Sequence, residues 1–89
     1  MPSILIEKLS EEEILKRNIR QWPIWKKGKS HFMELYDEEE QCLILSGEAK
    51  IKTAKGIFVI KEGDFVTFPE GLKCSWEIIS PIRKHYQIV

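Results

Sequence analysis

Short alternations of apolar and polar residues, separated by turn-forming residues, run through the chain from about residue 30 onward. Ala49 and Ile51 alternate with lysines, which is the pattern of a strand with one buried face. Residues 65–68 are a β-branched and aromatic run between turn signals at 63–64 and 69–71. This spacing predicts a meander of short antiparallel strands, and therefore a small sandwich or barrel.

A single short helix is expected before this meander. Ser10 and the three glutamates after it have the form of a capping box, with acids at the positive end of the helix dipole. Pro23 prevents the helix from running on, so we expect it to end near Asn18. Strands are expected at residues 3–9, 30–36, 40–46, 48–53, 57–60, 65–68, 73–79 and 82–89, with Ser46-Gly47 closing one strand and Ser80-Pro81 separating the last two.

The length of 89 residues predicts one domain over 1–89, and the 43% apolar content is enough for one core. Cys42 and Cys74 lack the spacing of a zinc knuckle and are expected to be thiols in a reducing compartment, with Cys42 in the core. No apolar run approaches the roughly 20 residues that a membrane span needs, and the N-terminus lacks a leader pattern. We therefore expect a cytoplasmic protein with no membrane partner.

The distribution of charged residues bears on two questions, whether the protein binds nucleic acid and whether it comes from a thermophilic organism. Residues 16–29 carry six basic residues and no acid, with Trp22 and Trp25 interleaved, which is one pattern of nucleic-acid binding. The net charge of zero and the acidic block that follows favour ion pairs within the protein instead, so no nucleic-acid partner is expected. Twelve Glu and eleven Lys against two Asp and three Arg are the bias of hyperthermophile proteins, or sampling noise in a short chain.

Three spacings carry a resemblance to a known family. Glu40 is followed after six residues by Gly47, Gly63 is followed after five by Pro69, and Cys74 lies three residues after Gly71. These spacings resemble the two cupin motifs, and the match covers about residues 30–79. The resemblance implies an all-β cupin fold, a double-stranded β-helix or jelly-roll barrel with one short N-terminal helix. More narrowly, the chain resembles the DUF861 branch that includes ureidoglycine aminohydrolase and the ethanolamine-utilisation cupins.

The chain differs from the family pattern at the positions of the metal ligands. Cupins usually hold a metal with two histidines and a glutamate from the first motif and a histidine from the second. Here the histidine positions fall on Glu34, Tyr36 and Cys74, and only Glu40 keeps its family identity. The implied cofactor is a divalent Mn, Fe, Ni or Zn ion held by Glu34, Glu40 and Cys74, or none at all.

The direction of these side chains depends on the strand register. A three-residue bend before Glu40 places Glu34 and Tyr36 inward, whereas a four-residue bend places Met33 and Leu35 inward. Buried carboxylates are costly unless they are paired or bind a ligand, so inward glutamates are candidates for function, although a solvated acidic stretch is the simpler alternative. His31 is expected to be exposed.

Candidate roles follow from the resemblance and from these residue types. Glu34, Glu40 and Lys84 are the expected catalytic residues, with Lys84 neutralising a ligand carboxylate or pairing with Glu34, or else simply solvated. A lone cysteine is more often a small buried hydrophobe than a nucleophile. The expected substrate contacts are Trp25, Tyr36, Cys74, Trp76 and Tyr86.

Two functions from different classes remain open. The first is a cupin that binds a small polar metabolite, nitrogen-containing or sugar-like, and catalyses hydrolysis or isomerisation with or without a metal. The second is a ligand-binding or structural cupin that has lost its metal histidines and has no catalytic activity. For either function we expect a homodimer, because residues 3–9 and the C-terminal Ile88-Val89 offer strand edges that a two-fold partner would cover.

Overall fold

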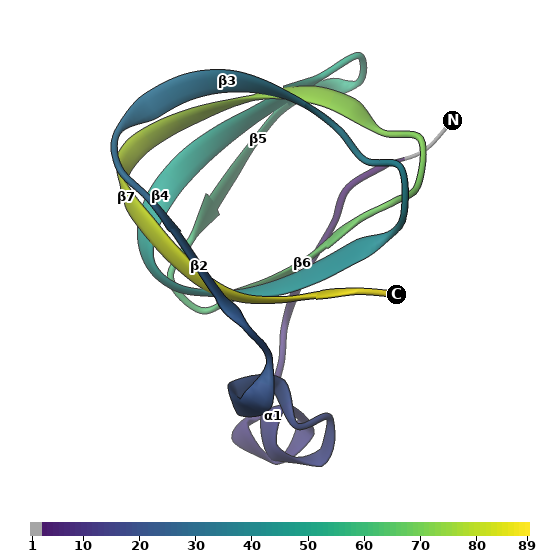
Figure 1. The fold of residues 1–89 in the computed structure, drawn as a ribbon, viewed down its shortest axis with the longest axis vertical. Helices are drawn as coiled ribbons and strands as arrows, with labels where there is room; N and C mark the ends of the chain where they lie inside the picture. Colours follow the sequence, from purple (N-terminus) through teal and green to yellow (C-terminus); the bar gives the residue numbers. More distant parts are fainter. Residues whose placement is uncertain (1–2) are drawn as a thin grey trace.

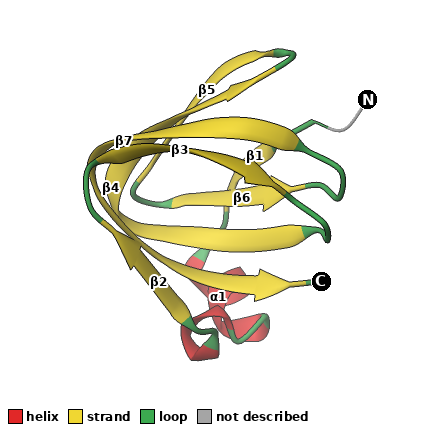
Figure 2. Ribbon diagram, turned by 45° about the horizontal axis from the view of Figure 1, so that its top comes forward, coloured by secondary structure: helices red, strands yellow, loops and turns green. Residues whose placement is uncertain are grey.

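The strands curve into a small barrel, with the helical segment outside it, in a computed structural model that describes residues 3–89 (Figures 1 and 2). The elements in chain order are β1 (Leu5–Lys8), α1 (Glu11–Lys16), a 3-10 helix η1 (Ile19–Gln21), β2 (Ile24–Lys27), β3 (Ser30–Leu35), β4 (Glu40–Thr53), β5 (Gly56–Lys61), β6 (Asp64–Phe68) and β7 (Lys73–Ile88). The predicted all-β roll with one short N-terminal helix is confirmed.

All strand pairs are antiparallel, and two long strands tie the roll together. The hydrogen-bonded order is β1-β6-β4-β7-β2, while β3 also pairs with β7 and β5 also pairs with β4. Because β4 and β7 each pair along one half with one set of strands and along the other half with another, they bend from one wall of the barrel to the other. Side chains from distant parts of the chain therefore meet inside.

The predicted breaks at Ser46-Gly47 and Ser80-Pro81 are wrong, because each lies within one continuous strand. The pairing of β4 with β7 shifts register on both sides of Ser46. Gly47 has φ +93°, and a Cβ on it would lie 2.0 Å from the carbonyl oxygen of Pro81. The turn-forming residues thus make an irregular bend with close backbone contact, which keeps the two strands paired around the corner.

The helix begins as predicted and ends earlier. The Ser10 hydroxyl accepts a hydrogen bond of 3.1 Å from the Glu13 amide, as the capping box requires. The helix stops at Lys16 because Asn18 adopts a left-handed conformation with φ 56° and η1 follows it. Ile14 and Ile19 pack against Leu43 and Phe65 on the outside of the barrel, in a core cluster separate from the interior one.

The register of β3 settles which residues face the interior. Tyr36 is buried and Glu34 is half-buried, whereas Met33 and Leu35 are 67% and 54% exposed. The three-residue bend is therefore correct and the four-residue alternative is wrong. None of the helices within residues 3–89 has the length and apolar character that a membrane crossing requires.

Candidate ligand-binding cavity in the barrel

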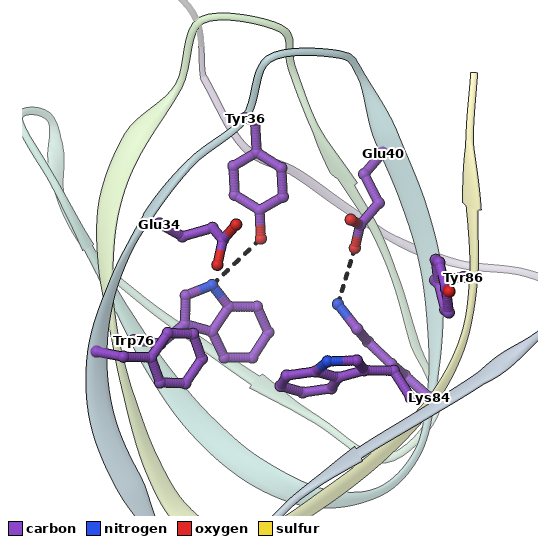
Figure 3. A pocket seen from close by; sticks show the side chains of 8 residues that line it. Glu34, Tyr36, Glu40, Trp76, Lys84 and Tyr86 are labelled. Atoms are coloured by element: carbon purple, nitrogen blue, oxygen red, sulfur yellow. Dashed lines mark hydrogen bonds and ion pairs between the residues drawn. The ribbon is translucent and has the colours of Figure 1, made fainter.

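A cavity of about 160 Å³ lies inside the barrel and is lined by side chains from four strands and the segment after β3 (Figure 3). The lining mixes three charged groups with aromatic rings and two phenols. Its residues are Trp25, Phe32, Glu34, Tyr36, Glu40, Trp76, Lys84 and Tyr86. Seven of these eight were candidate site residues from the sequence.

An ion pair between Lys84 of β7 and Glu40 of β4 crosses the cavity. The Lys84 Nζ lies 2.8 Å from Glu40 Oε2, and their side chains are only 5% and 14% exposed. Lys84 lies opposite Ile44 in the strand pairing, so its long side chain runs along the barrel to reach Glu40. The sequence had suggested Glu34 or a ligand carboxylate as its partner, and the structure identifies Glu40 instead.

Aromatic rings enclose the Lys84 ammonium group. Its nitrogen lies 4.8 Å from the ring centroid of Trp25, 5.0 Å from that of Trp76 and 5.6 Å from that of Phe68. Phe32 stacks on Trp76, with centroids 5.7 Å apart and planes 12° from parallel. Ring faces attract cations, so these contacts add to the attraction of Glu40 and hold the ammonium in a fixed position.

Tyr36 supplies a neutral hydroxyl beside this pair. The Trp76 Nε1–H donates a hydrogen bond of 3.2 Å to the Tyr36 oxygen, and the Tyr36 ring stacks on Phe68 with centroids 4.6 Å apart. Burial, and then the negative charge of Glu40, raise the pKa of Tyr36 well above its ordinary value. Because its oxygen accepts from Trp76, the Tyr36 O–H is directed elsewhere and can donate to a ligand.

Glu34 differs from the other two charged groups of the cavity. Its carboxylate lies in the cavity near Tyr36 and Trp76 (Figure 3). Within residues 3–89 it makes no hydrogen bond and no ion pair. Since Glu40 and Lys84 neutralise each other, Glu34 gives the cavity a net negative charge.

The predicted metal set of Glu34, Glu40 and Cys74 does not assemble. Cys74 lies opposite Glu34 in the strand pairing but is buried in the wall and does not line the cavity. Burial, and then the charge of Glu34, raise the pKa of its thiol to about 11, so it is protonated at neutral pH. Among the described residues no group of three or more His, Cys, Asp or Glu side chains could hold a metal.

The contact between Lys84 and Glu40 explains why the expected metal ligands do not come together. A lysine ammonium takes up the Glu40 carboxylate that the resemblance assigned to a metal. His31 is exposed, and His85 is buried outside the cavity with its Nδ1 2.9 Å from the Trp22 carbonyl oxygen. The residues present therefore do not fit the metal that the resemblance implied.

Phe32 is the cavity residue that the site prediction omitted. It alternates with Glu34 and Tyr36 along β3, and this alternation was the signal that could have identified it. The structure places the remaining candidates, Trp25 and Tyr86, in the lining. Trp25 and Trp76, which were both expected substrate contacts, have ring centroids 6.0 Å apart and together line one side of the cavity.

Comparison with known proteins gives a consistent result. Residues 16–86 match the family model described as the EutQ-like cupin domain. A DUF861 family protein of Thermotoga maritima is 42% identical in sequence, with a TM-score of 0.95 over 98% of this chain and all of that one. No curated protein sequence matches the chain significantly.

Two more distant structures share the fold. A putative ethanolamine utilization protein Q of Salmonella typhimurium is 16% identical, with a TM-score of 0.65 over 93% of this chain and 66% of that one. A cupin superfamily protein of Desulfitobacterium hafniense is 14% identical, with a TM-score of 0.59 over 98% of this chain and 78% of that one. At these identities the similarity concerns the architecture of the barrel.

Proposed function

The chain belongs to the EutQ-like cupin family, and from this premise we propose that its barrel cavity binds a small, positively charged, nitrogen-containing metabolite. The observation that carries the proposal is the Glu34 carboxylate, which lines the cavity without an ionic partner among residues 3–89. A partly buried carboxylate is stabilised by an opposite charge or by hydrogen-bond donors. An ammonium or amidinium group supplies both.

The cavity walls support the same ligand class. Trp25, Phe32 and Trp76 line the cavity, and aromatic rings of this kind hold cations as well as apolar groups, as Trp25 and Trp76 do for the Lys84 ammonium. The volume of about 160 Å³ is below the roughly 300–1,000 Å³ of pockets for drug-sized molecules. The ligand is therefore a compact metabolite.

For catalysis, we propose acid–base chemistry of the hydrolytic or isomerising kind. Glu34 is the group that accepts a proton, because it is the cavity carboxylate without a partner. Lys84 donates one hydrogen bond to Glu40, which leaves two ammonium N–H groups to hold an oxygen atom of the substrate. Tyr36 donates a hydrogen bond from its hydroxyl to the substrate and keeps its proton, since its raised pKa keeps the phenol neutral.

The rival proposal is a ligand-binding or structural cupin without catalytic activity. The Glu40–Lys84 pair supports this rival, because the family's glutamate is engaged by an internal cation. Binding and catalysis share the same first step, so a binding measurement comes first.

The test compares ligands that differ only in charge. Small ammonium, amidinium and guanidinium compounds are titrated against carboxylates and neutral alcohols of matched size, and the indole N–H signals of Trp25 and Trp76 are followed by NMR. We expect cations to shift these signals in a saturable way and anions to leave them unchanged. Saturable binding of the carboxylates, with no response to cations, would contradict the proposal.

A further inference from the structure

A shallow hollow on the outer surface of the barrel is lined by three cations and no acid. It has a volume of about 350 Å³, and Lys26, Lys27 and Arg83 line it together with Ser46 and Ile82. None of these three cations forms an ion pair with any residue in the range 3–89. We call this the basic hollow.

The strand register brings these charges together. Lys26 lies directly opposite Arg83 in the pairing of β2 with β7, and Arg83 lies opposite Ser46 in the pairing of β7 with β4. Their chain neighbours Trp25 and Lys84 line the barrel cavity, so Lys26 and Arg83 occupy the outer face of the same strands. Like charges directly opposite each other destabilise a sheet. Neither side chain forms an ion pair among residues 3–89 that would offset this repulsion.

We propose that the basic hollow binds the phosphate group of a small phosphorylated molecule. A guanidinium group can grip two phosphate oxygens at once, and each lysine adds a point charge. The Ser46 hydroxyl is a further donor at the same place. A dianionic phosphate offsets more of the charge on Lys26, Lys27 and Arg83 than a monocarboxylate does, which favours phosphate as the ligand.

The hollow also has room for the organic part of a phosphate ester. Its volume is about twice that of the barrel cavity, and the exposed Pro81 contributes an apolar surface to it. Lys26 and Arg83 lie on the face of β2 and β7 opposite to the cavity, and the two sites have no lining residue in common, although the Lys27 Nζ lies 5.2 Å from the ring centroid of Phe32. This inference is therefore independent of the function proposed for the cavity.

Titration with phenyl phosphate tests the inference, with benzoate as the monoanionic comparison. The experiment uses the full chain in about 150 mM NaCl, which screens weak surface attraction, and follows the backbone amide signals of residues 26–28 and 82–83 by NMR. We expect saturable shifts with phenyl phosphate and much weaker ones with benzoate. Affinity for phenyl phosphate should fall about ten-fold in Arg83→Gln and in Lys26→Gln, since each removes a charge-assisted hydrogen bond.

Three variants serve as controls. Lys52→Gln removes an exposed lysine outside the hollow and should change the affinity by less than about two-fold. Glu34→Gln should bind phenyl phosphate as the wild type does, which separates this site from the cavity. Arg83→Gln relieves the repulsion from Lys26, so it should melt no lower than the wild type, and phenyl phosphate should raise its melting temperature less than it raises that of the wild type.

Several results would overturn the inference. The first is the absence of saturable shifts at the hollow. The second is an equal loss of affinity in Lys52→Gln. The third is binding only to anionic lipid vesicles or to a single-stranded oligonucleotide, with none to phenyl phosphate, because it would identify a membrane surface or a nucleic acid as the partner instead.

Discussion

At the scale of single residues, the buried Lys84 ammonium and its carboxylate depend on each other. Glu40 is the one carboxylate that Lys84 pairs with among the described residues, and Lys84 is 5% exposed at its side chain. Removing one partner of a buried pair leaves an uncompensated charge, whereas replacing both removes the charge altogether. Substitutions of Glu40 and of Lys84 are therefore expected to have non-additive effects on the free energy of unfolding.

Variants of the pair measure this dependence. Glu40→Gln should lower the free energy of unfolding by about 3–5 kcal/mol, because the buried Lys84 ammonium would lose its carboxylate partner and remain surrounded by aromatic rings. Combining it with Lys84→Met should recover about 2 kcal/mol relative to the sum of the single losses. Urea unfolding of the wild type, both single variants and the double variant gives the coupling energy. Strict additivity would show that the pair contributes nothing as a unit.

The two thiols predict how stability changes at alkaline pH. Burial raises the pKa of Cys42 to about 12 and that of Cys74 to about 11, from an ordinary value of 9.0. Because these thiols lose their protons less readily in the folded protein than in the unfolded chain, their contribution to the free energy of unfolding is complete below pH 9. That contribution is lost as the pH rises through the pKa values of the folded protein. Urea unfolding at pH 8 and pH 10.5 should show a smaller loss for Cys74→Ala than for the wild type. An identical loss in both proteins would count against a buried, protonated Cys74.

Alternation predicted the inward face of β3, but it could not predict the partner of Lys84. Glu34 and Tyr36 share a face because successive side chains of a strand point to opposite sides. Glu40 and Lys84 are 44 residues apart in the chain, so their pairing depends instead on the register of β4 against β7 and on the length of the lysine side chain. No local pattern encodes that register. The sequence alone therefore could not show that Lys84 contacts the Glu40 carboxylate.

At the scale of elements, turn-forming residues mark either a turn between two strands or a bend within one strand, and the sequence alone did not distinguish the two. Gly63 and Gly71 lie in turns with positive φ, as predicted. Gly47 also has positive φ, yet it lies within β4, where it permits close contact with Pro81 of β7. The difference is a tertiary contact, so a strand end and a bend within a strand look alike in the sequence.

Substituting Gly47 should be costly for two separable reasons. In Gly47→Ala the Cβ would lie 2.0 Å from the Pro81 oxygen and the residue would hold a strained φ, so we expect a loss of about 3 kcal/mol or more. Gly56→Ala has the strain without the contact and should cost about 1–3 kcal/mol. Gly28→Ala has neither and should stay within about 0.5 kcal/mol. Thermal and urea unfolding rank the three, and equal losses would contradict the bend described above.

At the scale of the whole molecule, we propose that two chains associate. Leu5 on β1 is 53% exposed, and β1 pairs only with β6 among the described strands. Light scattering at micromolar concentration should give about 21 kDa, twice the chain mass of 10.5 kDa, and Leu5→Glu should shift the mass toward one chain. A mass of 10.5 kDa for the wild type would reject the dimer.

The barrel itself has two chemically different faces. Inside, one carboxylate without a partner remains after Glu40 and Lys84 neutralise each other, and outside, Lys26 and Arg83 repel each other on the same two strands that contribute Trp25 and Lys84. This separation follows from the alternation of side chains along β2 and β7. The two proposed sites therefore differ in the charge of the ligand that each should bind.

The affinity of Glu34→Gln for the best-bound small cation tests the central claim most directly. Calorimetric titration compares it with the wild type and with Glu62→Gln, which removes an exposed carboxylate from the turn between β5 and β6, away from the cavity. We predict at least about a ten-fold loss for Glu34→Gln and an unchanged affinity for Glu62→Gln. Equal affinities in all three proteins would contradict it.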